Sequence, residues 1–363
     1  MGSGGTIPNP TLQPALSTEI EAGIDLRFFN DRLGLDFTYY HQTTTDDIIQ
    51  QSISSATGFG NTNVNIGELR NQGFEIALTA TPVQGPLTWD IAFNIAKNTN
   101  KVVSLLPGLT NLVPNSFDAE PRTRNALVQQ IVGYPFGTIT GRVQQVDPNG
   151  NLIFTEGGWP LASTDFVPIG NGIAKATGGL NNSFTWKGIN LSFLIDFRIG
   201  GDIFSGTNNR LTQWGLSEQS LQGREGETPI HIKGVTRTGE GTDESPYVFS
   251  EVDRDLTPHE AYNYWDNVGG ETTAITTMFM YDGSFAKIRQ LTLGYSLPSS
   301  MLQKTPFKTV SISFVARNLA LLYKDIPNVD PESAYSNQAG AQGLEYFAMP
   351  TTRSFGFNLG LGF

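Results

Sequence analysis

Residue types that carry enzymatic or metal chemistry are few in this sequence, and their spacing fits no common site. There is no cysteine among the 363 residues, which excludes disulfides, thiolate metal sites and cysteine nucleophiles. The histidines are His41, His231 and His259, and His259-Glu260 lacks the second histidine of a zinc-protease motif. Gly200-Gly201-Asp202 lacks the lysine of a phosphate-binding loop. We therefore expect no enzymatic activity, no metal and no cofactor.

The segment Asp147-Pro148-Asn149-Gly150-Asn151 has the look of part of a calcium-binding loop. Calcium takes about six to eight oxygen ligands, several of them carboxylates. This segment offers one carboxylate, whereas Pro-Asn-Gly is a common β-turn sequence. The sequence therefore predicts a turn here.

Aromatic side chains are the stronger candidates for ligand contacts. Five of them lie in long segments between predicted strands: Trp159, Trp214, Tyr262, Tyr264 and Trp265. Their flat faces can stack on sugar rings or anchor a peptide. The alternative is that they pack the loops together or contact a partner protein. We treat the five as candidates for binding substrate or partner.

Segments with a period of two must position these residues, and this period is typical of β-strands with two different faces. In 19–29, apolar residues alternate with charged residues and glycine. The pattern recurs near 33–40, 74–80, 89–96, 180–186, 191–199, 284–295, 310–316 and 354–363, with an uncertain register around Lys287 and Arg289. The sequence thus predicts an all-β chain of about nine strands.

The connections between these strands alternate between short and long. Short ones are expected at 30–32, 82–86, 187–188 and 298–306, and long ones at 41–67, 102–174, 202–283 and 324–350. A transmembrane antiparallel β-barrel has this pattern, because short turns face the periplasm and long loops face the exterior. A soluble β-sandwich gives no reason for it.

The composition agrees with a barrel wall. Charged residues make up 16% of the chain, against about a quarter in average soluble proteins. No apolar run approaches the ~20 residues of a membrane-spanning helix, and barrel strands need none. The net charge of −11 argues against binding nucleic acid. Residues 1–8 resemble no signal peptide, so we expect the export signal outside this sequence.

The final segment has the clearest alternation. Phe355, Phe357, Leu359, Leu361 and Phe363 alternate with serine, glycine and asparagine, which predicts a strand that faces outer-membrane lipid and ends on the periplasmic side. We expect Leu359, Leu361 and Phe363 to form the signal that barrel-assembly machinery captures by strand addition. The simpler alternative is that Phe363 only anchors the strand at the membrane interface.

Several motifs occur in order along the chain: Asn9-Pro10-Thr11-Leu12-Gln13-Pro14, Gly23–Leu33, Asn65–Glu75, Leu291–Pro298, Arg317-Asn318-Leu319 and Asp330-Pro331-Glu332. Together with the terminal strand they resemble the C-terminal part of SusC/RagA-like TonB-dependent outer-membrane transporters of Bacteroidota-type bacteria. The resemblance covers nearly the whole chain.

The resemblance implies a barrel of about 22 strands around a plug. Residues 1–363 would then be the C-terminal portion of one such barrel, without the plug. An odd strand number agrees, because bacterial single-chain barrels have an even one and other polypeptide must complete the wall. It also implies energised import of oligosaccharide or peptide, with TonB acting through the plug and a SusD-like surface lipoprotein as a lid.

Two other readings of the sequence stay open. A SusC-like barrel can act as a structural scaffold in an outer-membrane complex without transport. A secreted β-sandwich adhesin would be soluble without detergent.

Overall fold

A computed structural model describes residues 5–106, 108–112, 125–334 and 341–363. The first four residues of the segment judged for an export signal lie outside the described residues, as do parts of two predicted long loops. Nine of the twenty described strands form one antiparallel sheet whose neighbours follow the order of the sequence. Its members are β2 (Leu16–Phe28), β3 (Leu33–Ser52), β4 (Asn61–Val83), β5 (Leu87–Ser104), β11 (Ala176–Trp186), β12 (Ile189–Ile199), β17 (Phe285–Ser296), β18 (Thr309–Lys324) and β20 (Ser354–Gly362).

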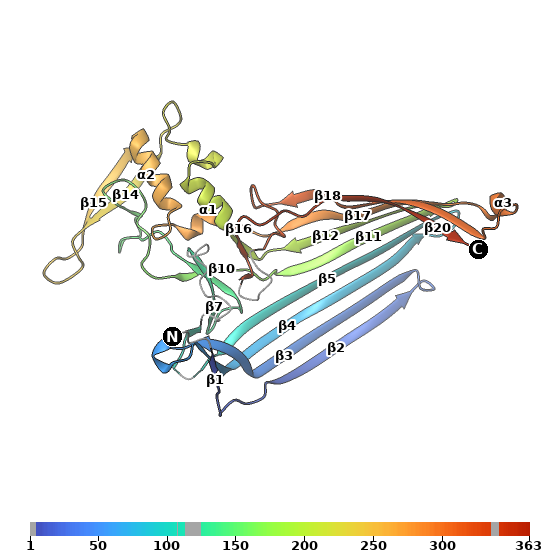
Figure 1. The fold of residues 1–363 in the computed structure, drawn as a ribbon, viewed down its shortest axis with the longest axis horizontal. Helices are drawn as coiled ribbons and strands as arrows, with labels where there is room; N and C mark the ends of the chain where they lie inside the picture. The colour runs from blue at the N-terminus through green and yellow to red at the C-terminus, as the bar shows by residue number, and fades with distance from the viewer. Residues whose placement is uncertain (1–4, 107, 113–124, 335–340) are drawn as a thin grey trace.

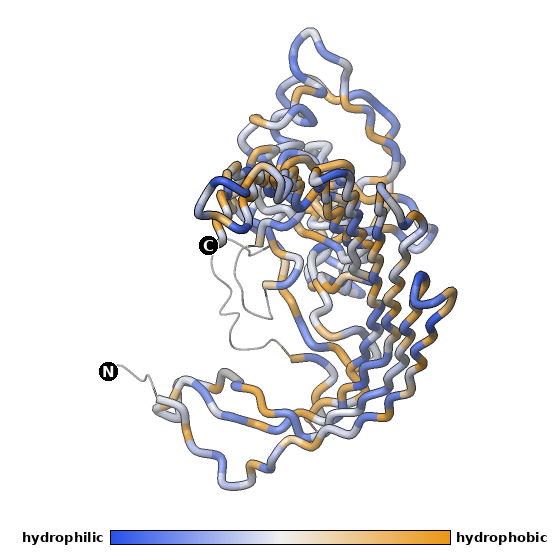
Figure 2. The backbone as a smooth tube through the Cα atoms, turned by 90° about the vertical axis from the view of Figure 1, so that its right-hand side faces the viewer, coloured by the Kyte–Doolittle hydropathy of each residue, from blue (hydrophilic) through white to orange (hydrophobic). Residues whose placement is uncertain are grey.

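These strands confirm the prediction of a partial barrel wall with about nine strands. They run side by side in Figure 1, and the end view in Figure 2 shows a curved wall that remains open on one side. In the described residues β2 and β20 are the two edges of the sheet, and the short β1 (Thr6–Ile7) adds a parallel pair with β4. The wall is a single layer, unlike the two packed sheets of a sandwich.

The register separates an apolar face from a polar face. One row on the apolar face crosses seven strands through Val83, Trp89, Phe184, Leu191, Leu293, Phe314 and Phe357. A row on the polar face runs through Asp25, Asp36, Ala77, Asn94, Gly179, Asp196 and Lys287. Rings stack along the apolar face, with centroids 5.5 Å apart for Trp89 and Phe184. Cross-strand contacts of this kind fix the register.

The prediction of a long loop over residues 41–67 is wrong. Strands β3 and β4 stay paired from Leu33 and Ala80 to Ser52 and Asn61, which leaves a connection of 53–60. The apolar alternation ends early, but threonine, glutamine and asparagine continue the backbone ladder. The one interruption in this ladder leaves Asp46, with φ 58°, and Gly67 opposite each other without ladder pairing.

In their described residues the other three long connections form helices and short strands, and we call the described residues within 105–175, 200–284 and 325–353 the loop region. Its helices and strands are β6 (Asn111–Leu112), β7 (Ala126–Ile131), β8 (Thr138–Gly141), β9 (Ile153–Phe154), β10 (Val167–Asn171), β13 (Asp202–Ser205), α1 (Gly206–Gln213), β14 (His231–Thr238), β15 (Val248–Asp255), α2 (Pro258–Val268), β16 (Met280–Asp282) and β19 (Leu344–Glu345). The region gathers at one end of the wall, and the short turns with α3 (Ser299–Leu302) lie at the other (Figure 1).

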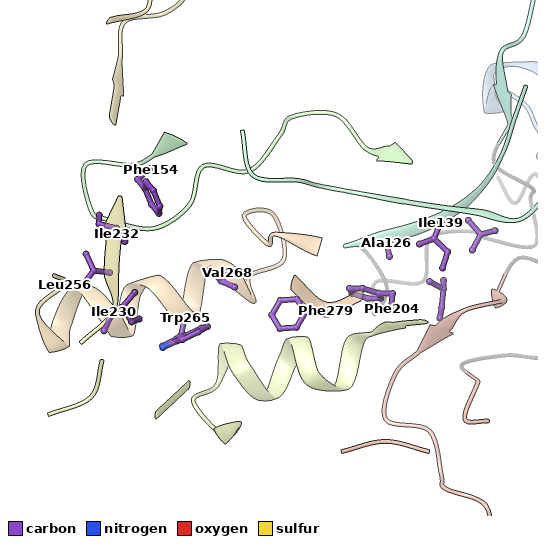
Figure 3. Close-up of a cluster of buried hydrophobic side chains, with 13 residues drawn as sticks. Ala126, Ile139, Phe154, Phe204, Ile230, Ile232, Leu256, Trp265, Val268 and Phe279 are labelled. Carbon is purple, nitrogen blue, oxygen red and sulfur yellow. The ribbon is translucent and has the colours of Figure 1, made fainter. Parts of the chain in front are cut away.

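The main hydrophobic core lies in the loop region. Phe204, Val268 and Phe279 are at most 1% exposed, and they join Trp265 and Ile139 in one cluster along α1 and α2 (Figure 3). No described helix has the length and apolar content needed to cross a bilayer. The wall carries its largest apolar side chains outward, whereas the loop region encloses them.

Candidate functional site

A bulge in β17 shapes the polar face near the loops. Leu194 pairs with Gln290 and Ile195 pairs with Ile288, so Arg289 lies between the paired positions. Lys287 and Arg289 are two residues apart, so alternation alone places both on the polar face, where their acidic partners lie. The extra residue shifts the alternation, so that Ile288 and Leu291, three residues apart, both lie on the apolar face. The uncertain register expected here has this cause.

The two cations form a network with three carboxylates. The Arg289 guanidinium donates to Asp196 from Nε, at 2.9 Å, and to Glu332 from Nη1, at 3.0 Å. The Lys287 ammonium donates to Glu332 and lies 3.6 Å from Asp330. Lys287 is 3% exposed, and a buried ammonium without these carboxylate partners would be strongly destabilising.

The network joins two of the motifs that carry the family resemblance, Arg317-Asn318-Leu319 and Asp330-Pro331-Glu332. Asn318 accepts a hydrogen bond from Arg289 and donates one to the carbonyl of Thr352, each 3.0 Å long. Burial raises the pKa of Glu332, but the hydrogen bonds from Arg289 and Lys287 outweigh it and hold that pKa below its ordinary value. Glu332 therefore carries its negative charge, and its ion pairs with Lys287 and Arg289 fix the last loop to the wall. Sequence reasoning named the motifs and missed their convergence, although Lys287 and Arg289 in an otherwise alternating strand were a signal of it.

A second anchor holds the same loop at its other end. Glu345 is 1% exposed and accepts hydrogen bonds from Ser205 Oγ at 2.8 Å and Thr207 Oγ1 at 2.5 Å. Strand β19 also pairs in parallel with β13. Nothing in the sequence pattern pointed to Glu345, because its partners lie more than a hundred residues away.

Two of the five candidate aromatics pack the loop region. Trp265 is 7% exposed, and its indole Nε1 donates to the carbonyl of Gln222 at 2.9 Å. Tyr264 meets it edge to face with ring centroids 5.0 Å apart, and burial raises the pKa of the Tyr264 hydroxyl. Most of the surface of Trp265 and Tyr264 is thus buried by packing within the loop region, which is the alternative role considered for them.

Trp214 and Tyr262 are different, with 58% and 67% of their surface exposed. Trp214 stacks on Phe347, with centroids 6.4 Å apart and ring planes 18° apart. Trp214, Tyr262 and Trp265 line one pocket of about 340 Å³. The structure therefore brings three of the five candidates together.

Trp159 lies apart from this pocket. Its ring covers Gly157 so closely that an added Cβ would lie 2.0 Å from it, and the side chain is half-buried. A glycine is required there by the close approach of the ring. Trp159 thus packs against its own turn.

The turn predicted at Asp147 is confirmed. Gly150 donates to the Asp147 carbonyl at 3.0 Å, and the Asp147 carboxylate accepts from the backbone of Asn149 and Asn151. Hydrogen bonds from Asn151, foremost that of its side chain, lower the pKa of Asp147. Local donors thus occupy the one carboxylate that suggested calcium.

The terminal strand presents its apolar side chains outward. Leu359, Leu361 and Phe363 are 65%, 45% and 74% exposed, and Phe363 also contacts Phe307, with ring centroids 5.1 Å apart. In the described residues β20 pairs only with β18, on one edge. Recognition of this strand by assembly machinery stays a prediction.

The chain has relatives among bacterial receptors. It is 27% identical over 379 residues to TonB-dependent receptor P3 of Formosa agariphila, a match that covers 98% of this chain and 35% of that protein. It is 25% identical over 297 residues to TonB-dependent receptor SusC of Bacteroides thetaiotaomicron, covering 79% of this chain and 26% of SusC. The chain therefore spans about a third of the length of these relatives.

The fold also occurs in solved structures. The RagAB peptide importer in its closed-closed state aligns with a TM-score of 0.67 at 19% identity, over 97% of this chain and 36% of that one. A family model described as "TonB dependent receptor-like, beta-barrel" matches residues 1–319. With the wall, the loop region and this match together, the chain belongs to the TonB-dependent receptor-like β-barrel family.

Proposed function

We propose that this chain forms part of the wall and the outer loops of a TonB-dependent importer of nutrient oligosaccharide or peptide in the outer membrane of a Bacteroidota-type Gram-negative bacterium. The observation that carries the proposal is the two-faced wall, with short turns at one end and a folded loop region at the other. An apolar face suits lipid, and a polar face suits a water-filled lumen.

The rest of the barrel and the plug come from further polypeptide of the same protein. The matched relatives are about three times as long as this chain. In lipid, unpaired backbone groups at the edges β2 and β20 would cost several kcal/mol each, so both edges need strand partners. During assembly, Leu359, Leu361 and Phe363 on β20 serve as the signal read by the barrel-assembly machinery.

Transport in this scheme has no covalent step and no catalytic residue. A SusD-like lipoprotein covers the loop region, and substrate is held between this lid and the barrel. TonB pulls on the plug and opens a path along the polar face. The Lys287–Arg289 network and Glu345 hold the last loop in place while the lid and the plug move.

Growth of a deletion strain tests the proposal. Strains with and without the gene are grown on single polysaccharides, oligosaccharides and peptides, with free monosaccharides and amino acids as controls. We expect loss of growth on one class of oligomer, restored by the gene, and we expect short-term uptake of that oligomer by the complemented strain to stop when the proton gradient is collapsed. Normal growth on every oligomer, together with loss of a surface complex, would replace import by a scaffold role.

A further inference from the structure

A pocket in the loop region lies between the end of α1 and the start of α2. Its volume is about 340 Å³, and its aromatic lining is Trp214, Tyr262 and Trp265. Helix α2 begins at Pro258 after the capping residue Thr257, which fixes the direction of the helix and of Tyr262 upon it. This pocket lies in the loop region, away from the polar face of the wall.

Two of the three aromatic rings are held in place by contacts within the loop region. Trp214 is supported on one side by Phe347, and the hydrogen bond from Trp265 Nε1 to Gln222 fixes the pocket floor. More than half of the surface of Trp214 and of Tyr262 remains exposed. Rigid, exposed rings bind a flat apolar surface at little loss of side-chain freedom.

One cation lies beside these rings. The guanidinium of Arg224 donates to the Ser220 carbonyl, the Ser220 hydroxyl and the Gly215 carbonyl, all of them neutral acceptors. It pairs with no carboxylate among the residues that the structure describes. In a chain of net charge −11, an exposed guanidinium without a carboxylate favours an anionic ligand.

The pocket is built for rings rather than for an extended peptide. Its lining residues come from α1, α2 and the segment between Trp214 and Arg224, and none lies in a strand. An extended peptide is recognised mainly through backbone hydrogen bonds to a strand edge. A sugar ring instead needs an aromatic face together with a few polar groups. The Tyr262 hydroxyl has no partner among the described residues, so it is available for this purpose.

We propose that this pocket is a surface subsite for an acidic sugar unit, a pyranose ring that carries a carboxylate or a sulfate group. The ring stacks on Trp214 and Tyr262, and Arg224 binds the anionic group. The inference rests on the proposed import function and deepens it, because it assigns an anionic oligosaccharide as the substrate class and places the first contact on the loops.

Calorimetric titration of the purified full-length receptor in detergent tests the subsite. The probes are oligogalacturonate, a sulfated galactan fragment, a neutral galactan fragment and an acidic peptide. We expect one of the anionic sugars to bind at least about tenfold more tightly than the neutral fragment, and its affinity to fall as salt rises. Preference for carboxylate or for sulfate identifies the anionic group.

Variants at the pocket locate the binding. Arg224→Gln lowers the ratio of the affinities for anionic and neutral sugars by about tenfold, and Arg224→Lys retains part of this ratio. Trp214→Ala lowers the affinity for every sugar. Tyr262→Phe, which removes only an exposed hydroxyl, keeps the fold and lowers affinity less. A matched control is Arg237 on β14, which stacks at 4.3 Å on Tyr247 before β15. Arg237→Gln and Tyr247→Ala leave sugar binding unchanged.

Three results would overturn the subsite. They are equal binding of neutral and anionic sugars, tighter binding of the acidic peptide, and loss of only the lipoprotein partner when Trp214 is replaced. If the deletion strain still loses growth on an oligomer, the import function stands while the subsite is rejected.

Discussion

The wall and the loop region treat apolar side chains in opposite ways. On the wall Phe357 is 76% exposed and Phe355 is 62% exposed, whereas in the loop region Phe204 and Phe279 are at most 1% exposed. The same chain thus has a wall face whose exposed apolar side chains suit contact with lipid, and a loop region that buries its apolar side chains away from water. The difference follows from the solvent, since a lipid-facing strand gains nothing by hiding its apolar residues from hydrocarbon.

The largest expected effect is in the core of the loop region. Replacing Phe279 by alanine leaves a cavity beside Phe204 and lowers the free energy of unfolding of this region by about 3–5 kcal/mol. Limited proteolysis of the loops in the detergent-solubilised receptor measures it. Phe357→Ala on the wall is the control, and equal protease sensitivity of the two variants would contradict the contrast between the regions.

The next largest effect is expected in the Lys287–Arg289 network, which joins the wall to the loop region. Lys287→Met leaves Glu332 and Asp330 short of a cation and lowers the free energy of unfolding by on the order of 3 kcal/mol, measured by thermal unfolding in detergent. Lys304→Met, at an exposed lysine in a short turn, has little effect. Adding Glu332→Gln to Lys287→Met recovers part of the loss, and no recovery would reject the pairing.

A charge distinguishes the two faces of the wall. Phe357→Arg places a cation on the apolar face and destabilises the folded barrel in a bilayer by about 2–4 kcal/mol, whereas Asn358→Arg, one residue further, costs much less because it faces the polar side. Urea titration in lipid vesicles reads out both. Equal losses would mean that the faces are assigned wrongly.

A smaller effect is expected at the start of α2. Thr257 Oγ1 accepts from the Glu260 backbone and the Glu260 side chain accepts from the Thr257 backbone, which forms a capping box. Thr257→Ala therefore lowers the free energy of unfolding of the loop region by about 1 kcal/mol, and Thr257→Ser lowers it less. Protease sensitivity of the loops compares the two, and identical behaviour would reject the cap.

Acid weakens the same cap. Hydrogen bonds from Arg254 and from Thr257 lower the pKa of Glu260 from 4.5 to about 2. Because the folded-state pKa is depressed, the stabilisation is present above pH 4.5 and is lost as the pH falls toward 2. Glu260→Gln removes this part of the pH dependence in loop proteolysis, and an unchanged profile would contradict the assignment.

The wall could be predicted and the loop region could not, for a physical reason. Each wall strand pairs with the wall strands that come before and after it along the chain. Period-two alternation and the spacing of the turns are therefore enough to predict the sheet. The core of the loop region joins Phe204, Phe279 and Ile139, which share no periodicity and meet only in the fold. One local signal was present, since Thr257-Pro258-His259-Glu260 reads as a capping box before α2.

The candidate site could be predicted only in part, because some of its residues come together only in the fold. Residue type alone selected Trp214 and Tyr262, whereas Arg224 enters the pocket through a turn that no pattern announces. The bulge at Arg289 was seen as a break in alternation, but its partner Glu332 required the fold.

Cysteine labelling tests the central claim most directly, because the chain contains no cysteine of its own. Asp243→Cys lies between β14 and β15 in the loop region, and Gln84→Cys lies in the short turn between β4 and β5. In an otherwise cysteine-free receptor on intact cells, a membrane-impermeant maleimide is predicted to label Asp243→Cys at once and Gln84→Cys only after the outer membrane is permeabilised. Labelling of both sites on intact cells, or of Gln84→Cys alone, would contradict a wall that spans the membrane with its loops outside.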